Sequence, residues 1–145
     1  ASDRADEHHQ QTLWPFVAIT EIERHPNTYI VRLKNIGTGV AVGGKLDVVM
    51  GHRNLETVEP LGEYGPIGIH GQNTVTLTNL ALLKDSAGKF PDWIVFRVTF
   101  ESIFHSTGYI DWMFRPALGT LTSGAYSSPP INKRGARPST RESDF

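Results

Sequence analysis

Residues 93–105 alternate between apolar and polar side chains, and this pattern limits the fold more than any other in the chain. Large apolar residues hold one set of positions and polar or charged residues hold the other: Ile94, Phe96, Val98, Phe100 and Phe104 against Arg97, Thr99, Glu101 and His105. A period of two is that of a β-strand with one buried face, which is typical of antiparallel sheets. Because such a strand must cover its apolar face with another layer, the chain is expected to fold as packed β-sheets.

The same alternation recurs in shorter runs that are separated by Gly, Pro and Asn. It predicts strands at residues 14–23, 28–35, 40–50, 74–82, 93–105 and 109–115, with a short strand around Ile67 and Ile69. The rest of the stretch 51–72 is rich in Gly and Pro and is interpreted as a loop. Apolar spacing of three and four is not sustained, so no long helix is expected. The sequence predicts an all-β sandwich.

The turn at residues 35–39 reads Asn-Ile-Gly-Thr-Gly and follows the strand at 28–35. We expect Gly37 or Gly39 to adopt positive φ, a region that glycine enters without steric cost. An alanine at that position would then destabilise the fold through backbone strain.

The last two predicted strands are joined by Ser106-Thr107-Gly108, which has the composition of a hairpin turn. If His105 faces Tyr109 across that turn, Phe100 opposes Phe114 on the apolar face. That face is expected to be core, with a buried cluster of Phe96, Val98, Phe100, Trp112 and Phe114.

Length and charge exclude several classes of protein. The chain has 145 residues, which suits one domain. Fourteen Lys and Arg against fifteen Asp and Glu give a net charge of -1, so no overall field attracts nucleic acid. The absence of Cys excludes disulfides and thiolate metal sites. The longest run without a charged residue, 64–83, contains Gly, Pro, His, Gln and Asn, so no transmembrane helix is expected.

The composition changes at Pro116. Residues 116–145 are rich in Gly, Ser, Thr and Pro, which is typical of a segment without its own core. We therefore expect a polar lead-in at 1–13, a β-sandwich domain at 14–115 and a C-terminal arm at 116–145. The few large apolar residues of the arm are expected to anchor it on other subunits instead of its own sandwich: Leu118, Leu121, Tyr126, Ile131 and Phe145.

Several short phrases resemble a known class of domain. They are Trp14-Pro15-Phe16-Val17, then Val31-Arg32-Leu33-Lys34-Asn35-Ile36-Gly37-Thr38-Gly39-Val40-Ala41, then Pro60-Leu61-Gly62-Glu63, and then the closing hairpin. Over residues 14–115 they resemble small immunoglobulin-like β-sandwich domains of bacterial proteins. Such domains often follow a single N-terminal membrane helix, and many have no assigned function. The resemblance implies an immunoglobulin-like fold and weakly favours the cell envelope, with membrane association through a segment that this sequence does not contain.

No catalytic or metal-binding constellation stands out. The six histidines are not spaced as ligands on one strand or helix. Two alternatives stay open for a ligand-binding or hydrolytic domain: His52 and His70 with Glu56 or Glu63 in the stretch 51–72, and Glu101, His105 and Asp111 as an acid–base group on the last hairpin. Solvated side chains are the favoured interpretation. We expect no cofactor, no metal and no enzymatic activity.

Apolar residues outside the predicted core mark the expected partner contacts. Trp93 follows Phe90 at the entrance to a strand, and Ile103 lies on an outer face. Together with the arm, the predicted partner-binding residues are Phe90, Trp93, Ile103, Leu118, Leu121, Tyr126 and Ile131. The expected function is that of a non-catalytic structural or protein-binding module. It would join a larger complex or homo-oligomer of protein subunits, without nucleic acid, through its terminal arms and sheet surface.

Overall fold

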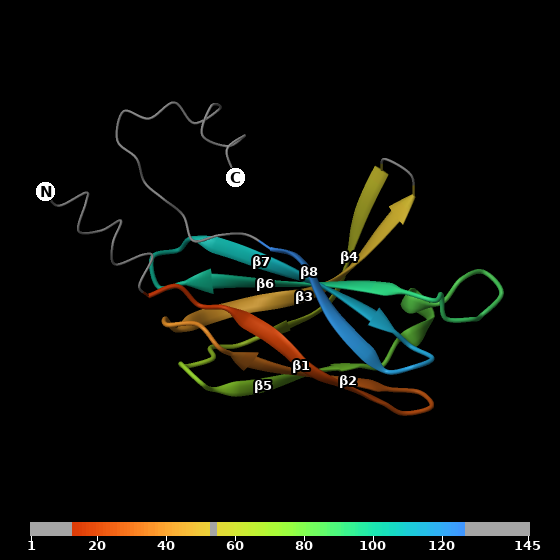
Figure 1. Cartoon of the computed structure of the whole chain (residues 1–145), viewed down its shortest axis with the longest axis horizontal. Helices are drawn as coiled ribbons and strands as arrows, with labels where there is room; N and C mark the ends of the chain where they lie inside the picture. Colours follow the sequence, from red (N-terminus) through yellow and green to blue (C-terminus); the bar gives the residue numbers. More distant parts are fainter. Residues whose placement is uncertain (1–12, 53–54, 127–145) are drawn as a thin grey trace, which may run out of the picture.

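The computed structural model describes residues 13–52 and 55–126 (Figure 1). They form eight strands and one short 3-10 helix, η1. In chain order these are β1 Val17–Arg24, β2 Tyr29–Asn35, β3 Ala41–His52, β4 Leu55–Tyr64, β5 Gln72–Leu77, η1 Leu80–Leu83, β6 Ile94–Ser102, β7 Thr107–Arg115 and β8 Thr120–Tyr126. In this part of the chain, no helix has the length and hydropathy needed to cross a membrane.

The strands form two antiparallel sheets that pack against each other. The smaller sheet has the order β1-β2-β5, and the larger has the order β4-β3-β6-β7-β8. Inward side chains of both sheets meet in one core, to which β2 contributes Val31 and Leu33 and β6 contributes Phe96 and Phe100. The predicted all-β sandwich is confirmed.

β6 shows why the alternating pattern was informative. Burial alternates at every position of this strand, and the side chains of Phe96, Val98 and Phe100 are 0% exposed. The predicted cluster is confirmed for these residues and for Phe114. Trp112 is half-buried and packs against the edge of the same core.

The pairing of β6 with β7 differs from the predicted register. Phe100 pairs with Gly108, whereas the sequence interpretation placed it opposite Phe114. Phe114 instead pairs with Ile94. The two registers differ by an even number of residues, so the apolar face remains inside although each individual pair is wrong.

The turn of this hairpin also begins earlier than predicted. Residues 103–106 form it, and β7 starts at Thr107. The Ser102 hydroxyl accepts hydrogen bonds from the backbone amides of Phe104 and Ser106, and His105 adopts a φ of 64°. A serine side chain that accepts hydrogen bonds from the amides of the following residues favours a turn at that serine. The sequence prediction placed the turn at Gly108 and missed this signal.

The turn at residues 35–39 uses its glycines for close packing. Neither Gly37 nor Gly39 has positive φ, so that prediction is wrong. A Cβ added at Gly39 would lie 1.7 Å from the backbone oxygen of Leu13, and one added at Gly37 would lie 2.4 Å from that of Trp14. Glycine is required here because the segment before β1 runs directly against the turn.

Asn35 holds this end of the sandwich together. Its side chain is 0% exposed, and its Nδ2 donates to the carbonyl oxygens of Gly39 at 2.8 Å and Ile67 at 3.0 Å. Its Oδ1 accepts from the backbone amides of Gly37 at 3.0 Å and Phe16 at 3.2 Å. One side chain therefore joins the segment just before β1, the turn at residues 35–39 and the loop after β4.

The stretch 51–72 was predicted to be mainly a loop, and this is wrong. β3 continues to His52 and the chain returns as β4, an edge strand that includes Pro60. Proline is tolerated there because an edge strand leaves part of its backbone unpaired. β3 pairs with β6 only as far as Val49, so the end of the β3–β4 hairpin projects beyond the sheet (Figure 1). The short strand predicted around Ile67 is a single bridge to Ala41.

The larger sheet continues beyond Arg115, where the sequence interpretation ended the domain. Gly119 takes positive φ in the intervening turn, and β8 then pairs with β7, with Leu121 opposite Phe114. The start of the predicted arm is thus an edge strand, and truncation after Arg115 would remove a strand that is paired with β7. Residues 1–12 and 127–145, including Ile131 and Phe145, lie outside the described residues.

Candidate functional site

The outer face of the larger sheet carries apolar side chains that the core does not use. Val58 of β4 pairs with Val49 of β3, Val49 also pairs with Val95 of β6, and Val95 pairs with Met113 of β7. We call these four residues the outer apolar row. Val58 is 43% exposed and the others are half-buried. The solvent face of an antiparallel sheet is normally polar, so an apolar row across four strands is an unusual feature of this face.

Trp93 extends this surface beyond the end of β6. It lies two residues before Val95, so it is on the outer face of the sheet, as Val95 is. Trp93 is 44% exposed. The Arg115 guanidinium lies 4.8 Å from the centre of its ring. An exposed Trp held by a cation is a typical anchor in protein interfaces.

A charged row lies beside the apolar row. Arg97 of β6 pairs across the sheet with Asp47 on one side and Asp111 on the other. Its Nε donates to Asp111 Oδ1 at 2.7 Å and its Nη2 donates to Oδ2 at 3.0 Å, while the guanidinium lies 4.6 Å from the ring centre of Tyr109. This two-bond geometry fixes Arg97 on Asp111.

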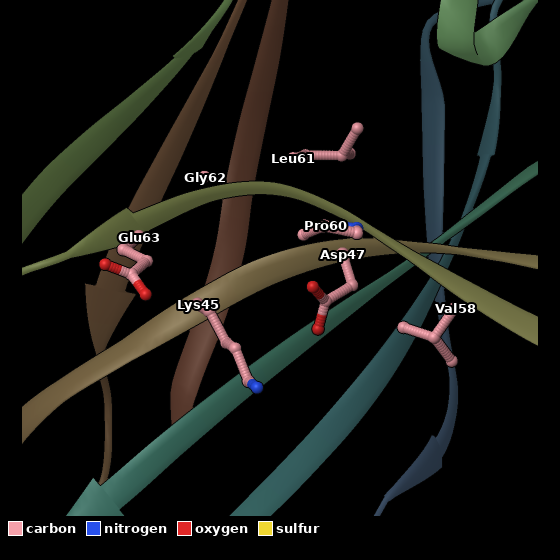
Figure 2. Close-up of a pocket in the computed structure, with 7 residues that line it drawn as sticks. All are labelled: Lys45, Asp47, Val58, Pro60, Leu61, Gly62 and Glu63. Atoms are coloured by element: carbon pink, nitrogen blue, oxygen red, sulfur yellow. The ribbon is translucent and has the colours of Figure 1, made fainter.

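Asp47 lines a groove between β3 and β4. The groove has a volume of about 690 Å³ and is lined by Lys45, Asp47, Val58, Pro60, Leu61, Gly62 and Glu63; we call it the Asp47 groove. Figure 2 shows the Asp47 carboxylate between the side chains of Lys45 and Val58. Asp47 is 5% exposed, and no described residue donates a hydrogen bond to it or forms an ion pair with it.

Burial raises the pKa of Asp47 above its ordinary value of 3.8, and the charges of Lys45 and Arg97 partly oppose this. Between the ordinary and the raised pKa, the folded protein binds more protons than the unfolded chain. Stability therefore falls as pH rises through that window, and above it the loss is constant. A largely buried carboxylate that receives no hydrogen bond from a described residue lowers the stability of the isolated fold.

Asp47→Asn should therefore stabilise the protein at neutral pH, because the amide keeps the shape and removes the buried charge. The gain should disappear near pH 3, about one unit below the ordinary pKa of an aspartate, because Asp47 is then protonated in both the folded and the unfolded protein. Urea unfolding of both variants at the two pH values measures this. Equal stability at neutral pH would show that Asp47 is adequately solvated.

The predicted partner contacts fall at several places. Trp93 and Ile103 are 44% and 45% exposed at opposite ends of β6, and Leu118 and Tyr126 are each 61% exposed. Phe90 and Leu121 are half-buried against the core, and Phe90 stacks on Tyr29 with ring centres 5.4 Å apart. Of the predicted set, Trp93 is the residue that lies next to the outer apolar row.

The two alternative His and carboxylate sites are not assembled by the described residues. Glu101 and His105 form an exposed pair, with Oε2 and Nδ1 2.9 Å apart, but Asp111 binds Arg97 instead. His70 is in the loop after β4, where it takes a φ of 63°. The side chains of His52 and Glu56 lie outside the described set. Within that set, no group of three or more His, Asp or Glu residues is placed to hold a metal ion.

The sequence interpretation missed the outer apolar row and Asp47. An aspartate within the apolar run Leu46-Asp47-Val48-Val49 was the available signal, because a charge there must either face outward or find a partner. The row itself depends on cross-strand register, including a bulge between Leu46 and Asp47. Alternation along one strand does not reveal that register.

Comparison with protein-family models, with curated proteins and with solved structures gives no significant match.

Proposed function

We propose that this protein is a non-catalytic protein-binding module that joins an assembly through the outer face of its larger sheet. The observation that carries the proposal is the outer apolar row, Val58, Val49, Val95 and Met113, with Trp93 beside it. These side chains have no covering layer in the described chain. Covering them with a second protein surface would gain about 25 cal/mol for each Å² of apolar area removed from water.

We propose a second copy of the same chain as the partner. The face has an apolar centre and carries both signs of charge, with Arg97 between Asp47 and Asp111 and with Arg115 beside Trp93. A two-fold contact brings one patch against itself, so a patch that holds both signs can pair without net repulsion. Residues 1–12 and 127–145 of the terminal arms remain part of the proposal as secondary contacts, and they lie outside the described residues.

Val95→Lys tests the proposal, because it places a charge at the centre of the row without touching the core. Light scattering on the full chain should give the mass of an oligomer for the unchanged protein and of a monomer for the variant. Ile69→Lys is the matched control, since Ile69 is 47% exposed in the loop between β4 and β5 and is not part of the outer apolar row, and it should leave the oligomer intact. A monomeric unchanged chain at about 100 μM would contradict self-assembly.

We also propose that the sandwich is immunoglobulin-like. Labelled in chain order, β1, β2 and β5 take the places of strands A, B and E, and β4, β3, β6 and β7 take those of C′, C, F and G. β8 is an additional strand beside G. This order supports the resemblance seen in the sequence and also makes the proposed contact face the C′CFG sheet.

A further inference from the structure

We propose that the Asp47 groove binds the ammonium group of a lysine-type side chain on a partner polypeptide. The polypeptide source of that group rests on the protein-binding function proposed above. The preference of the groove for an alkylammonium ion stands on the groove alone. Three features of the groove lead to this ligand: a largely buried carboxylate to which no described residue donates a hydrogen bond, an excess of negative charge among the lining residues, and apolar walls.

Asp47 is the acceptor on which the proposed ligand would bind. It is 5% exposed and lines the groove, and none of the described residues donates a hydrogen bond to it. Buried polar groups in folded proteins are almost always hydrogen-bonded, and a carboxylate gains most from a charged donor. Because the carboxylate points into an open groove (Figure 2), an entering ligand can supply that donor.

The charges around the groove favour a cation. Arg97 is committed to Asp111 by two hydrogen bonds. Lys45 is opposite Glu63 in the register of β3 and β4, yet among the described residues it forms no ion pair with Glu63 or Asp47. Two carboxylates, Asp47 and Glu63, and one ammonium group, that of Lys45, line the groove. The positive charge of Arg97, which also acts on Asp47, is balanced by Asp111. An entering cation is attracted, and an entering phosphate or carboxylate is repelled.

The walls suit an alkyl chain instead of a bare metal ion. Val58, Pro60 and Leu61 line the groove beside the carboxylates, and apolar surface of this kind accommodates the methylene stem of a lysine. Within the described residues, there is no group of three or more metal-ligating side chains. A site with an apolar wall, a buried carboxylate and a second carboxylate at its rim matches a primary ammonium group on a flexible stem.

The direct test is a titration of the isotope-labelled full chain with Nα-acetyl-lysine-N-methylamide, followed by NMR chemical shifts. Backbone amides of residues 45–49 and 58–63 should shift in a saturable way. The matched neutral probe, in which the Nε is also acetylated, should shift them far less. Equal shifts from both probes would overturn the proposal, because binding would then not depend on the ammonium charge.

Three variants sharpen this test. Asp47→Asn should weaken lysine-probe binding by about tenfold or more, as expected for loss of a charge-assisted hydrogen bond. Glu59→Gln makes the same change in net charge at a β4 residue that does not line the groove, and it should bind as the unchanged protein does. Lys45→Met should tighten binding, because it removes the competing ammonium group. Unchanged binding in both the Asp47 and Lys45 variants would overturn the proposal.

Two further measurements separate the possible outcomes. n-Butylammonium presents the same group without a peptide backbone, and weaker binding of this probe than of the lysine probe supports a polypeptide source. Equal binding would overturn the polypeptide source and leave a free amine as the ligand. Light scattering on the same samples distinguishes the two proposals. Saturable shifts in a monomeric chain would support ammonium binding in the groove and contradict self-assembly. An oligomer without ammonium-specific shifts would support self-assembly and contradict ammonium binding.

Discussion

Asn35→Ala should lower the free energy of unfolding by about 3 to 5 kcal/mol, because it leaves buried backbone groups without partners. The side chain is 0% exposed and makes four hydrogen bonds, to the backbone of Phe16, Gly37, Gly39 and Ile67. Removing an amide in a site that water does not reach costs more than the net value of the bonds themselves. Urea unfolding followed by tryptophan fluorescence measures the loss.

Asn73→Ala is the matched control for this effect. Asn73 lies on the neighbouring strand β5, opposite Leu33, and within residues 13–52 and 55–126 its side chain bonds only the amide of the following residue, Thr74. Its loss should cost less than about 1 kcal/mol, as for a residue near the surface. Similar losses at both positions would show that Asn35 is not a specific link between segments.

Phe100→Ala should cost about 3 to 5 kcal/mol, the range expected for an aromatic side chain removed from a packed core. Phe100 is 0% exposed, and its ring packs against Trp14, with ring centres 5.6 Å apart, and against Phe16 at 6.2 Å. The cavity would open between the two sheets, next to the Trp14 and Phe16 rings. Calorimetry or urea unfolding of the full chain would measure the change in stability.

Phe104→Ala distinguishes the observed hairpin from the predicted one. In the predicted register Phe104 opposed Ile110 on the core face, but in the structure it lies half-buried in the turn, and Ile110 pairs with Val98. The Phe104 variant should therefore lose clearly less stability than the Phe100 variant. Losses of equal size would favour the register predicted from the sequence.

The faces of the strands were predictable from the sequence, but their pairing was not. Alternation at β2 and β6 correctly placed Val31, Leu33, Phe96 and Phe100 in the core, because a strand with one buried face has a fixed period. The partner of each residue depends on turn length and on bulges. Ser102 begins the turn after β6 with side-chain hydrogen bonds to backbone amides, and a search based on glycine does not detect such a turn.

The same distinction applies to the candidate site. Trp93 could be selected from the sequence because it is a large aromatic residue at the entrance to a strand. The outer apolar row could not, because Val49, Val58, Val95 and Met113 come from four strands and meet only through register. β4 itself was missed because Pro60 and Gly62 indicate a loop, although an edge strand accepts both.

The contact between Phe16 and Tyr126, with ring centres 6.1 Å apart, has a consequence for how the domain is connected. Phe16 directly precedes the first strand and Tyr126 ends the last one, so the polypeptide enters and leaves the sandwich at the same end. A polypeptide linker on either side of the domain would therefore be attached at this one end. The turn between β1 and β2 and the turn before β8 would point away from the attachment, and the sheet face with Val95 would remain open to a neighbour approaching from the side.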